Sequence, residues 1–478
     1  MTDKPDLLIK VLQEQVVSKN ALIHTIGMDR SSFYQLLRGK RPGTTDQIAS
    51  ILSQLELNQE LTEQLVREYL IRKFGNGYQL YEQVDRWMKI LSAADERRES
   101  GAPAEDAGES SGDNTCEALA EDTVGASEVH SAGSKADIEV VSQLRQLILE
   151  ERDNPQGGVP LCLYIPVKFF SSLWMETDVP ELLGAVSETS EVRILLGLDL
   201  NAQQQMEGKL ELLFSFLFGL YHIRNFAQIV HCIELNHTDE DTPFPYFAAG
   251  RDKLFLMNEV CSRGLVTGQK DLVAEYRDFF TRLTEQPYEY LESYDSLEDF
   301  MGSLFQRFIA NAGQDRVSRM VERRLCIFKV VNEEQIAHYA PQGMQEFLMA
   351  YLRMFRQMQI IFINSAGALQ EFMSDNTVME NGIRITIDSA DAETIRQQAA
   401  HAGDNGILFL SGSQDHLPRN WVFVLFSTGE LIILPNWDCS HIISIRNSQL
   451  YQAFGAWFDV CRELTMVREK LADRVGEQ

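Results

Sequence analysis

The sequence predicts a multidomain protein: a small all-α domain at the N-terminus, followed by a large mixed α/β (α+β) module. Apolar residues recur three or four positions apart from Leu7 to Phe74, which is typical of helices, and no alternating strand pattern interrupts them. Beyond residue 137, short apolar runs typical of buried strands alternate with amphipathic helical stretches. Between these regions lies a segment rich in Asp, Glu, Gly, Ser and Ala that contains no Phe, Trp or Tyr.

Composition limits the functions that this chain can have. The 478 residues include 43 Lys and Arg against 70 Asp and Glu, a net charge of −27, which excludes a generally basic nucleic-acid coat protein. Residues 1–75 hold ten basic and nine acidic residues, so any contact with nucleic acid must be local. Seven scattered cysteines without a CxxC pair exclude a disulfide framework and the usual zinc-finger spacings. We therefore predict no metal and no cofactor.

The chain carries no pattern that predicts insertion into a membrane. Its most apolar stretch, Leu210 to Tyr221, is about half the roughly 20 residues that a spanning helix needs. The N-terminus, MTDKPD, lacks the cationic and apolar regions of a signal peptide. We expect a cytoplasmic protein without a membrane partner, and the scattered cysteines fit a reducing compartment.

Composition also divides the chain into five parts. Residues 95–137 cannot bury enough apolar surface to offset the entropy of ordering them, which predicts a disordered acidic linker. Before the linker, apolar residues at Tyr78, Tyr81, Val84 and Leu91 share one helix face that needs a partner, in a dimer or on the first domain. The predicted parts are the helical domain 1–75, a connecting helix 76–94, the linker 95–137, and two α/β sensor or assembly subdomains, 138–300 and 301–478.

A weak internal repetition runs through the C-terminal module. A strand at Tyr246–Gly250, a second strand at Lys253–Met257 and a helix resemble the pattern of Trp421–Phe426, Leu431–Leu434 and a following helix. Duplication and coincidence explain this likeness equally well. Further strands are predicted at residues 161–169, 192–198, 325–331, 360–363, 382–387 and 407–410, and helices at residues 208–221, 272–285, 343–358, 392–402 and 448–471.

Residues 18–58 carry the most specific pattern in the chain. Ser18 is a good N-cap for a short helix, and Gly27 allows the left-handed backbone of a tight turn between helices. Asp29 can cap a second helix that ends near Gly39. The spacing of the inward-facing residues is that of a helix-turn-helix, with Leu22, Ile26, Met28, Phe33 and Leu36 around the turn glycine.

Residues 7–75 resemble the lambda-repressor-like (Xre/Cro-type) family of helix-turn-helix DNA-binding domains. Ser18-Lys19 stand where that family usually has Thr-Gln, and Gly39-Lys40-Arg41 match the Gly-Lys-Arg that closes its recognition helix. Two residues depart from the pattern: Ile23 replaces a small Ala, and Lys19 replaces Gln. The resemblance implies DNA binding by this domain. Further matches are Gly27-Met28 and the packing-helix residues Ile48, Ala49, Leu52, Leu55 and Leu57.

The polar residues of this motif predict how it would contact DNA. Arg30, Ser31, Ser32 and Gln35 lie off the Phe33 stripe, where they can reach base edges or phosphates of a major groove. Basic residues around the helix end are better placed for phosphates. The alternative is an ordinary helical hairpin whose charges are only solvated. The predicted DNA-binding residues are Ser18, Lys19, Arg30, Ser31, Ser32, Tyr34, Gln35, Arg38, Lys40 and Arg41.

The C-terminal module contains few candidates for chemistry. Cys439 and His441 would share a face on a strand, as a thiolate–imidazole pair requires, but no third partner is evident and a buried structural Cys explains the pattern better. Residues 411–416 contain Ser, Asp and His in one loop, which we interpret as a solvated turn. We therefore predict no catalytic residue and no enzyme.

Three arginines offer a place for an anionic ligand. Arg316, Arg319 and Arg323 would share one face of a predicted helix, spaced to meet a phosphate or a carboxylate. Ion pairs with the neighbouring Asp315 and Glu322 are the alternative use of these charges.

Together these features predict a bacterial-type transcription regulator. The helix-turn-helix would bind double-stranded operator DNA, and the C-terminal module would sense a small-molecule or protein effector or mediate oligomerisation. A homodimer is expected because one such domain buries too little DNA surface for tight specific binding. Two alternatives remain open: an enzyme or defence-type effector with an accessory helix-turn-helix, and a protein-interaction scaffold.

Overall fold

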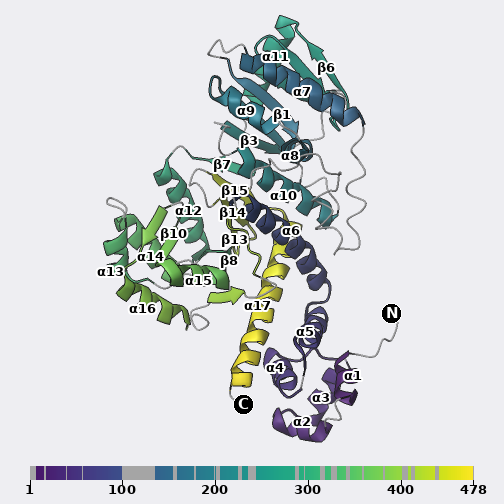
Figure 1. The fold of residues 1–478 in the computed structure, drawn as a ribbon, viewed down its shortest axis with the longest axis vertical. Helices are drawn as coiled ribbons and strands as arrows, with labels where there is room; N and C mark the ends of the chain where they lie inside the picture. The colour runs from purple at the N-terminus through teal and green to yellow at the C-terminus, as the bar shows by residue number, and fades with distance from the viewer. Residues whose placement is uncertain are drawn as a thin grey trace, which may run out of the picture. The chain divides into compact units, whose positions relative to one another are not determined.

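The computed structural model of the chain forms two compact units (Figure 1). One consists of residues 1–95 and 293–478, and the other of residues 96–292. The predicted linker 95–137 falls mostly outside the described residues, which begin again at Lys135. The structure describes residues 7–14, 18–38, 40–55, 57–99, 135–153, 159–176, 179–198, 200, 205–223, 229–234, 244–285, 290–294, 296–312, 318–324, 331–340, 345–357, 360–380, 383–400, 407–410, 415–435 and 441–476.

The N-terminal part of the first unit is helical, as the sequence predicts. Capping side chains fix where its helices begin: Thr44 and Gln47 form a capping box at α4, and Asn58 caps α5. The apolar faces meet in a core that includes Phe33 and Ile51, both completely buried. The helices are α1 (Leu7–Glu14), α2 (Lys19–Thr25), α3 (Arg30–Leu37), α4 (Thr45–Ser53) and α5 (Gln59–Phe74).

A seven-stranded sheet forms the rest of the first unit, in the order β12-β9-β8-β13-β14-β15-β7. Strands β8, β9 and β12 are parallel, whereas β13, β14 and β15 form an antiparallel meander that joins the sheet at β8. The strands are β7 (Leu291–Ser293), β8 (Ser318–Glu322), β9 (Ile360–Ser365), β12 (Ile407–Leu410), β13 (Trp421–Leu425), β14 (Leu431–Pro435) and β15 (His441–Ile445).

Helices and a small hairpin connect these strands. The parallel strands are buried on both faces, which fits sheets whose crossovers are helical. The connecting elements are α12 (Leu297–Ala312), α13 (Glu333–Tyr339), α14 (Gln345–Gln357), α15 (Ala366–Asp375), the hairpin β10 (Thr377–Glu380)–β11 (Ile383–Thr386) and α16 (Ser389–Ala400).

The second unit has a six-stranded sheet in the order β3-β2-β1-β4-β5-β6. Strands β1, β2 and β3 are parallel, and β4 joins β1 in the antiparallel sense. Its elements are α7 (Lys135–Asp153), β1 (Leu161–Pro166), α8 (Val167–Glu176), α9 (Val179–Ser187), β2 (Val192–Leu198), α10 (Met206–Ile223), β3 (Ile229–Glu234), β4 (Tyr246–Ala249), β5 (Leu254–Met257), β6 (Gly264–Thr267) and α11 (Lys270–Thr284).

The two sheets repeat one strand order. In each sheet, three parallel strands are followed in the chain by three antiparallel strands. The first parallel strand pairs with the first antiparallel strand: β1 with β4 in one sheet, and β8 with β13 in the other. The repetition predicted from the sequence covers β4, β5 and α11 in one unit and β13, β14 and the C-terminal helix in the other. The sequence prediction omitted the third antiparallel strand of each set, β6 and β15.

Two long helices, α6 (Asn76–Glu99) and α17 (Ser448–Gly476), connect the helical domain to the sheet within the first unit. At about 1.5 Å per residue, the 29 residues of α17 extend about 43 Å. Near its start, Phe454 stacks on Phe423 of β13 with ring centroids 5.5 Å apart. Farther along, α17 packs on α4 and α5, which Figure 1 shows beside the yellow helix.

The apolar face of α6 finds its partner in the C-terminal part of the chain. Val84 and Met88 are fully buried, and the Cβ position of Gly77 lies 3.8 Å from Cβ of Ala456 on α17. Its partners within the described chain are α17 and the segment before β13, and Glu82 also pairs with Arg67 of the first domain at 2.6 Å. A contact with a second copy stays a prediction. The helix also extends five residues beyond the predicted end at residue 94.

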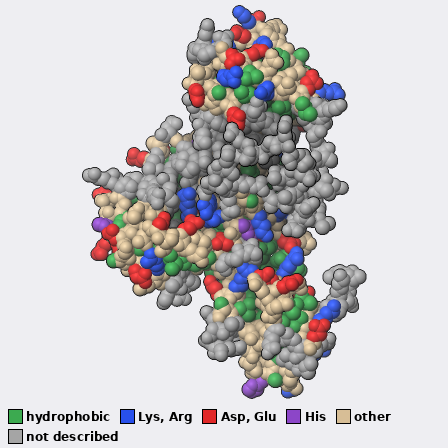
Figure 2. Space-filling model, viewed as in Figure 1, with side chains coloured by type: hydrophobic (Ala, Val, Ile, Leu, Met, Phe, Trp, Pro, Cys, Tyr) green, Lys and Arg blue, Asp and Glu red, His purple; other side chains and the backbone are tan. Residues whose placement is uncertain are grey.

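Surface charge is mixed over the visible face of the molecule, where Figure 2 shows acidic and basic side chains interspersed. Among the described residues, no helix is both long enough and apolar enough to cross a bilayer.

Candidate nucleic-acid interface

Helices α2 and α3 form a tight helix–turn–helix whose local signals are those predicted. The Ser18 hydroxyl accepts a hydrogen bond from the amide of Ala21 at 3.4 Å, and the Asp29 carboxylate accepts one from Ser32 at 2.9 Å. Gly27 lies between the helices with φ of +64°, a conformation that costs glycine nothing. The caps and the turn glycine thus set the angle at which α3 leaves α2.

Helix α3 has one buried side and one exposed side. Phe33, Leu36 and Leu37 are 5% exposed or less. Between them, Tyr34 is 39% exposed, and its ring meets that of Phe33 edge-on. The exposed predicted DNA-binding residues are Ser18, Arg30, Ser31, Tyr34, Arg38, Lys40 and Arg41, and the half-buried ones are Lys19, Ser32 and Gln35.

One residue of the motif deviates from its predicted place. Ile26, expected in the core, is only half-buried because it is the C-cap of α2, where the chain turns away from the helix. Leu37, which the sequence pattern did not single out, is buried beside Leu36. Gly39, expected to end α3, lies outside the described residues.

The basic side chains of this face have no carboxylate partners within the described part of the chain. None of the ion pairs there involves Lys19, Arg30, Arg38, Lys40 or Arg41. The one acidic group among them, Asp29, is engaged by Ser32, whose hydroxyl and amide hydrogen bonds lower the pKa of Asp29. We name these five basic residues the α3 basic face.

The side of the helical domain formed by α4 and α5 packs on α17, and a buried carboxylate lies in this contact. Glu463, which is 8% exposed, accepts hydrogen bonds from Thr45 Oγ1 and Tyr69 OH, both at 2.5 Å, and pairs with Lys73 Nζ at 2.6 Å. Burial alone would raise the pKa of Glu463, but the hydrogen bonds from Lys73, Thr45 and Tyr69 outweigh it and lower the pKa.

Charged pairs also lie at the rim of this contact. Lys470 of α17 pairs with Asp46 of α4, and Arg468 lies 3.8 Å from Glu63 of α5. We call Glu463 and these two pairs, with their partners, the α17 contact.

A second polar network joins α6 to the C-terminal part. Asp85 accepts from His416 Nε2 at 2.9 Å and from Trp457 Nε1 at 3.4 Å, and it pairs with Lys89 at 3.0 Å. Burial would raise the pKa of Asp85, but His416 and Lys89 lower it overall. The prediction of a solvated turn is therefore wrong for His416, and Asp415 likewise accepts from the amide of Gly367 at 2.9 Å.

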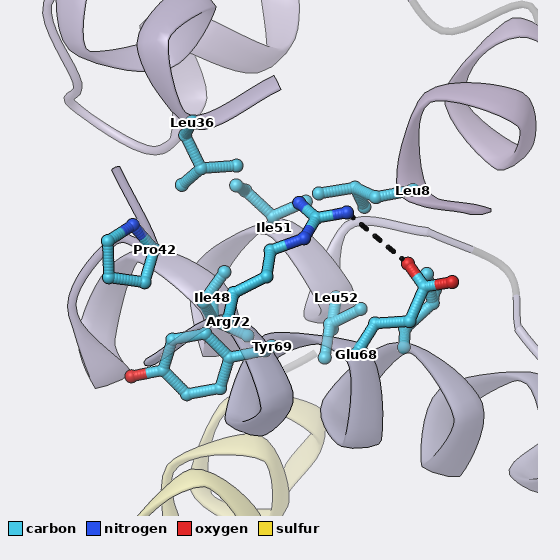
Figure 3. A pocket seen from close by; sticks show the side chains of 10 residues that line it. Leu8, Leu36, Pro42, Ile48, Ile51, Leu52, Glu68, Tyr69 and Arg72 are labelled. Carbon is cyan, nitrogen blue, oxygen red and sulfur yellow. Dashed lines mark hydrogen bonds and ion pairs between the residues drawn. The ribbon is translucent and has the colours of Figure 1, made fainter. Parts of the chain in front are cut away.

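Between α1, α3, α4 and α5 the helical domain encloses a small pocket (Figure 3). It offers about 20 Å³, room for about one water molecule. Its polar rim is the pair of Arg72 and Glu68, whose charged atoms are 3.5 Å apart. A cavity of this size holds no effector, and it belongs to the packing of the domain.

The arginines predicted as an anion site are placed differently from the prediction. Arg319 lies on strand β8 and not on a helix, with a guanidinium nitrogen 2.8 Å from Asp459 and its guanidinium carbon 5.4 Å from the ring centre of Phe458. Arg323 donates to the carbonyl of Leu417 at 3.5 Å. Arg316 lies outside the described residues. Sequence spacing suggested a helix because positions 316, 319 and 323 would share one helix face, whereas the partners of Arg319 and Arg323 lie far along the chain.

Two of the buried cysteines, Cys162 and Cys461, are unsuited to nucleophilic chemistry. Burial raises the pKa of Cys162 to about 11, and burial also raises that of Cys461 well above the usual range. Thiols of this kind stay protonated at neutral pH. Cys439 lies outside the described residues, and His441 is the first residue of β15. Within the described ranges, no group of acidic, His and Cys side chains is arranged to bind a metal ion.

Comparison with known proteins adds no relative to this picture. No known protein-family model matches the chain, and no curated protein matches it.

Proposed function

We propose that this chain is a transcription regulator that binds operator DNA through α2 and α3. The observation that carries the proposal is the α3 basic face: five basic side chains without carboxylate partners among the described residues, in a chain of net charge −27. Elsewhere in the helical domain, Arg67, Arg72 and Lys73 pair with carboxylates, whereas Lys10 on α1 is exposed and enters no ion pair among the described residues. Of these five residues, Lys19 lies on α2, Arg30 begins α3, and Arg38, Lys40 and Arg41 follow its end. Cations without carboxylate partners around one helix are what contact with phosphates requires.

The geometry of α3 suits a major groove. An α-helix with its side chains is about 10–12 Å in diameter, which fits the major groove of about 12 Å, and α3 is eight residues long. Arg30 and Ser31 stand in the first turn, from which recognition helices contact base edges. Arg38, Lys40 and Arg41 follow the helix and are suited to phosphates, which fix the position of the domain without reading sequence.

The α17 contact supplies a route by which the sheet could regulate DNA binding. Helix α17 packs on β12 and β13 and also on α4 and α5, so a shift of the sheet against α17 would reorient α3. The seven-stranded sheet would then be the sensing part of the regulator. A second copy of the chain would supply the second half-site that tight binding needs.

The test separates base reading from phosphate contact in the full-length protein. We expect selection from a randomised duplex library to yield a preferred site, and Arg30→Ala with Gln35→Ala to weaken that preference. Lys40→Ala with Arg41→Ala should reduce affinity for all duplexes and lower the salt dependence by about two phosphate contacts. Arg353→Ala, which removes an exposed arginine paired with Glu333, is the matched control.

Two results would reject the proposal. One is retention of duplex DNA that is equal for the wild-type protein and both double variants in fluorescence anisotropy. The other is an equal loss of affinity in the Arg353→Ala control, which would show that only total charge matters.

A further inference from the structure

A hollow beside the seven-stranded sheet has the features of a ligand site. It lies between α12 and the turn that joins β13 to β14, and its volume of about 670 Å³ is in the range of small-molecule pockets. Four of its residues recur at the spacing of one face of α12. The lining residues are Ser303, Gln306, Arg307 and Ala310 with Asn311 on α12, then Thr428, Gly429 and Glu430 in the turn, and Arg446 after β15.

Small side chains and an ordered turn make this space. Gly429 has φ of +94°, and a Cβ atom placed there would meet no atom within 4 Å. Asn311, which is 5% exposed, accepts hydrogen bonds from the hydroxyl of Ser427 at 3.3 Å and the amide of Thr428 at 3.4 Å. These hydrogen bonds attach the turn to α12, and no side chain fills the space beside Gly429.

The charges in the hollow are cationic in sum. Glu430, 8% exposed, accepts on one carboxylate oxygen from Arg307 at 2.7 Å, from the Ser444 hydroxyl at 2.6 Å and from Arg446 at 3.4 Å. Two guanidinium groups therefore face a single carboxylate. The lining thus carries a net positive charge in a chain with 70 acidic and 43 basic residues.

The two arginines have different roles. The Arg307 side chain is only 15% exposed and is oriented by its short contact with Glu430. The Arg446 side chain is 79% exposed, and its contact with the same oxygen is long. Because exposed ion pairs of this kind contribute little, Arg446 can turn to an incoming anion at small cost. Glu430 then remains as an acceptor for hydroxyl groups of the ligand.

We propose that this hollow binds a small organic anion, whose carboxylate or phosphate group is bound by Arg446 and Arg307 and whose hydroxyl groups donate to Glu430 or to the side-chain carbonyl oxygen of Gln306. Guanidinium groups bind both kinds of oxyanion with paired hydrogen bonds. The interpretation of this hollow as the effector site of a regulator rests on the proposed function. The binding of an anion does not rest on it, because binding is tested without DNA.

Isothermal titration calorimetry with the full chain tests the proposal. The probes are inorganic phosphate, citrate and glucose 6-phosphate, with glucose as the neutral control. We expect at least one anion to bind, and the comparison between phosphate and citrate to separate the two oxyanion chemistries. Arg446→Glu should weaken that binding by at least about tenfold. Ala310→Phe, which fills the hollow without a change of charge, should also weaken it.

Arg353→Glu is the matched control, since it reverses an exposed arginine of another helix in the same unit and should leave binding unchanged. Binding that survives both Arg446→Glu and Ala310→Phe would overturn the proposal, and so would the absence of heat with all three anions at millimolar concentration. Anisotropy with duplex DNA, measured separately with and without the bound anion, distinguishes failure of this site from failure of the regulator function.

Discussion

The charged side chains on the two sides of the helical domain differ in whether they have a partner within the described chain. On the side of α4 and α5, Thr45, Tyr69 and Lys73 all converge on Glu463 of α17, 390 or more residues away in sequence. On the side of α2 and α3, Arg30 and Arg38 are exposed and enter no ion pair within the described residues. The same small domain thus has one side covered by its own chain and another side that no described residue covers.

This difference assigns separate physical tasks to the two sides. A buried carboxylate with three donors fixes orientation, because each donor would lose its partner if the helices separated. An exposed row of cations contributes nothing measurable to stability and leaves its charge for a partner molecule. Variants on the α17 contact should therefore change stability, whereas variants on the α3 basic face should change DNA affinity with little effect on stability.

The largest effect on stability is expected from Glu463→Ala. It leaves the Lys73 ammonium and the Tyr69 hydroxyl without their acceptor, and should lower the free energy of unfolding by roughly 2–4 kcal/mol. Glu463→Gln keeps an acceptor oxygen but not the charge, so its free energy of unfolding should lie between those of the wild-type protein and Glu463→Ala. Urea unfolding followed by circular dichroism measures both. Glu469→Gln, an exposed position on the same helix, is the control, and an equal loss there would break the distinction drawn between the two sides.

The same carboxylate should make the free energy of unfolding depend on pH. The loss of stability on its protonation should be no larger than the loss in Glu463→Gln. Since the folded-state pKa of Glu463 is lowered from 4.5, its stabilisation is present above that pH and is lost as the pH falls through the lower folded value. The stability difference between wild type and Glu463→Gln should therefore narrow below about pH 4.5. A difference that stays constant from pH 7 down to acid unfolding would mean that the charge of Glu463 is not what Lys73 recognises.

A smaller effect is expected in the turn between α2 and α3. Gly27→Ala meets no neighbouring atom but must adopt φ of +64°, which costs an L-residue about 1 kcal/mol. Gly184→Ala in α9 is the matched control, because its Cβ also meets no atom and the position needs no positive φ. Since alanine is favoured over glycine inside a helix, this variant should be slightly more stable than the wild-type protein. Calorimetric melting of the two variants gives the comparison, and equal shifts would show that the turn is not strained.

Local signals were the part of the fold that sequence could predict. The caps at Ser18 and Asp29 and the turn at Gly27 each depend on residues within a few positions, and all three are confirmed. Strands 192–198 and 407–410 were predicted with their observed bounds because their apolar runs end abruptly at polar or small residues. In these segments, propensity and burial agree.

Errors arose where a partner far along the chain determines the structure. Strand β8 contains Arg319, which resembles a surface helix residue until Asp459 and Phe458 of α17 are placed beside it. His416 was interpreted as part of a solvated loop because its partner, Asp85, lies 331 positions away. For the candidate interface, the apolar spacing of α3 predicted the exposure of Arg30, Ser31 and Tyr34, but Ser32 and Gln35 are half-buried. The α17 contact had no local signal.

The smallest effect on stability should come from the exposed ion pairs at the rim of the α17 contact. It compares these exposed pairs with the buried Glu463 of the same contact. Lys470 and Asp46 are 33% and 65% exposed, so water and salt screen their attraction. A double-mutant cycle of Lys470→Ala and Asp46→Ala should give a coupling energy of about 0.5 kcal/mol or less, falling further at high salt. The cycle also removes the separate contribution of Asp46 at the first turn of α4. A coupling as large as the loss in Glu463→Ala would mean that the rim charges, and not the buried carboxylate, attach the helical domain to α17.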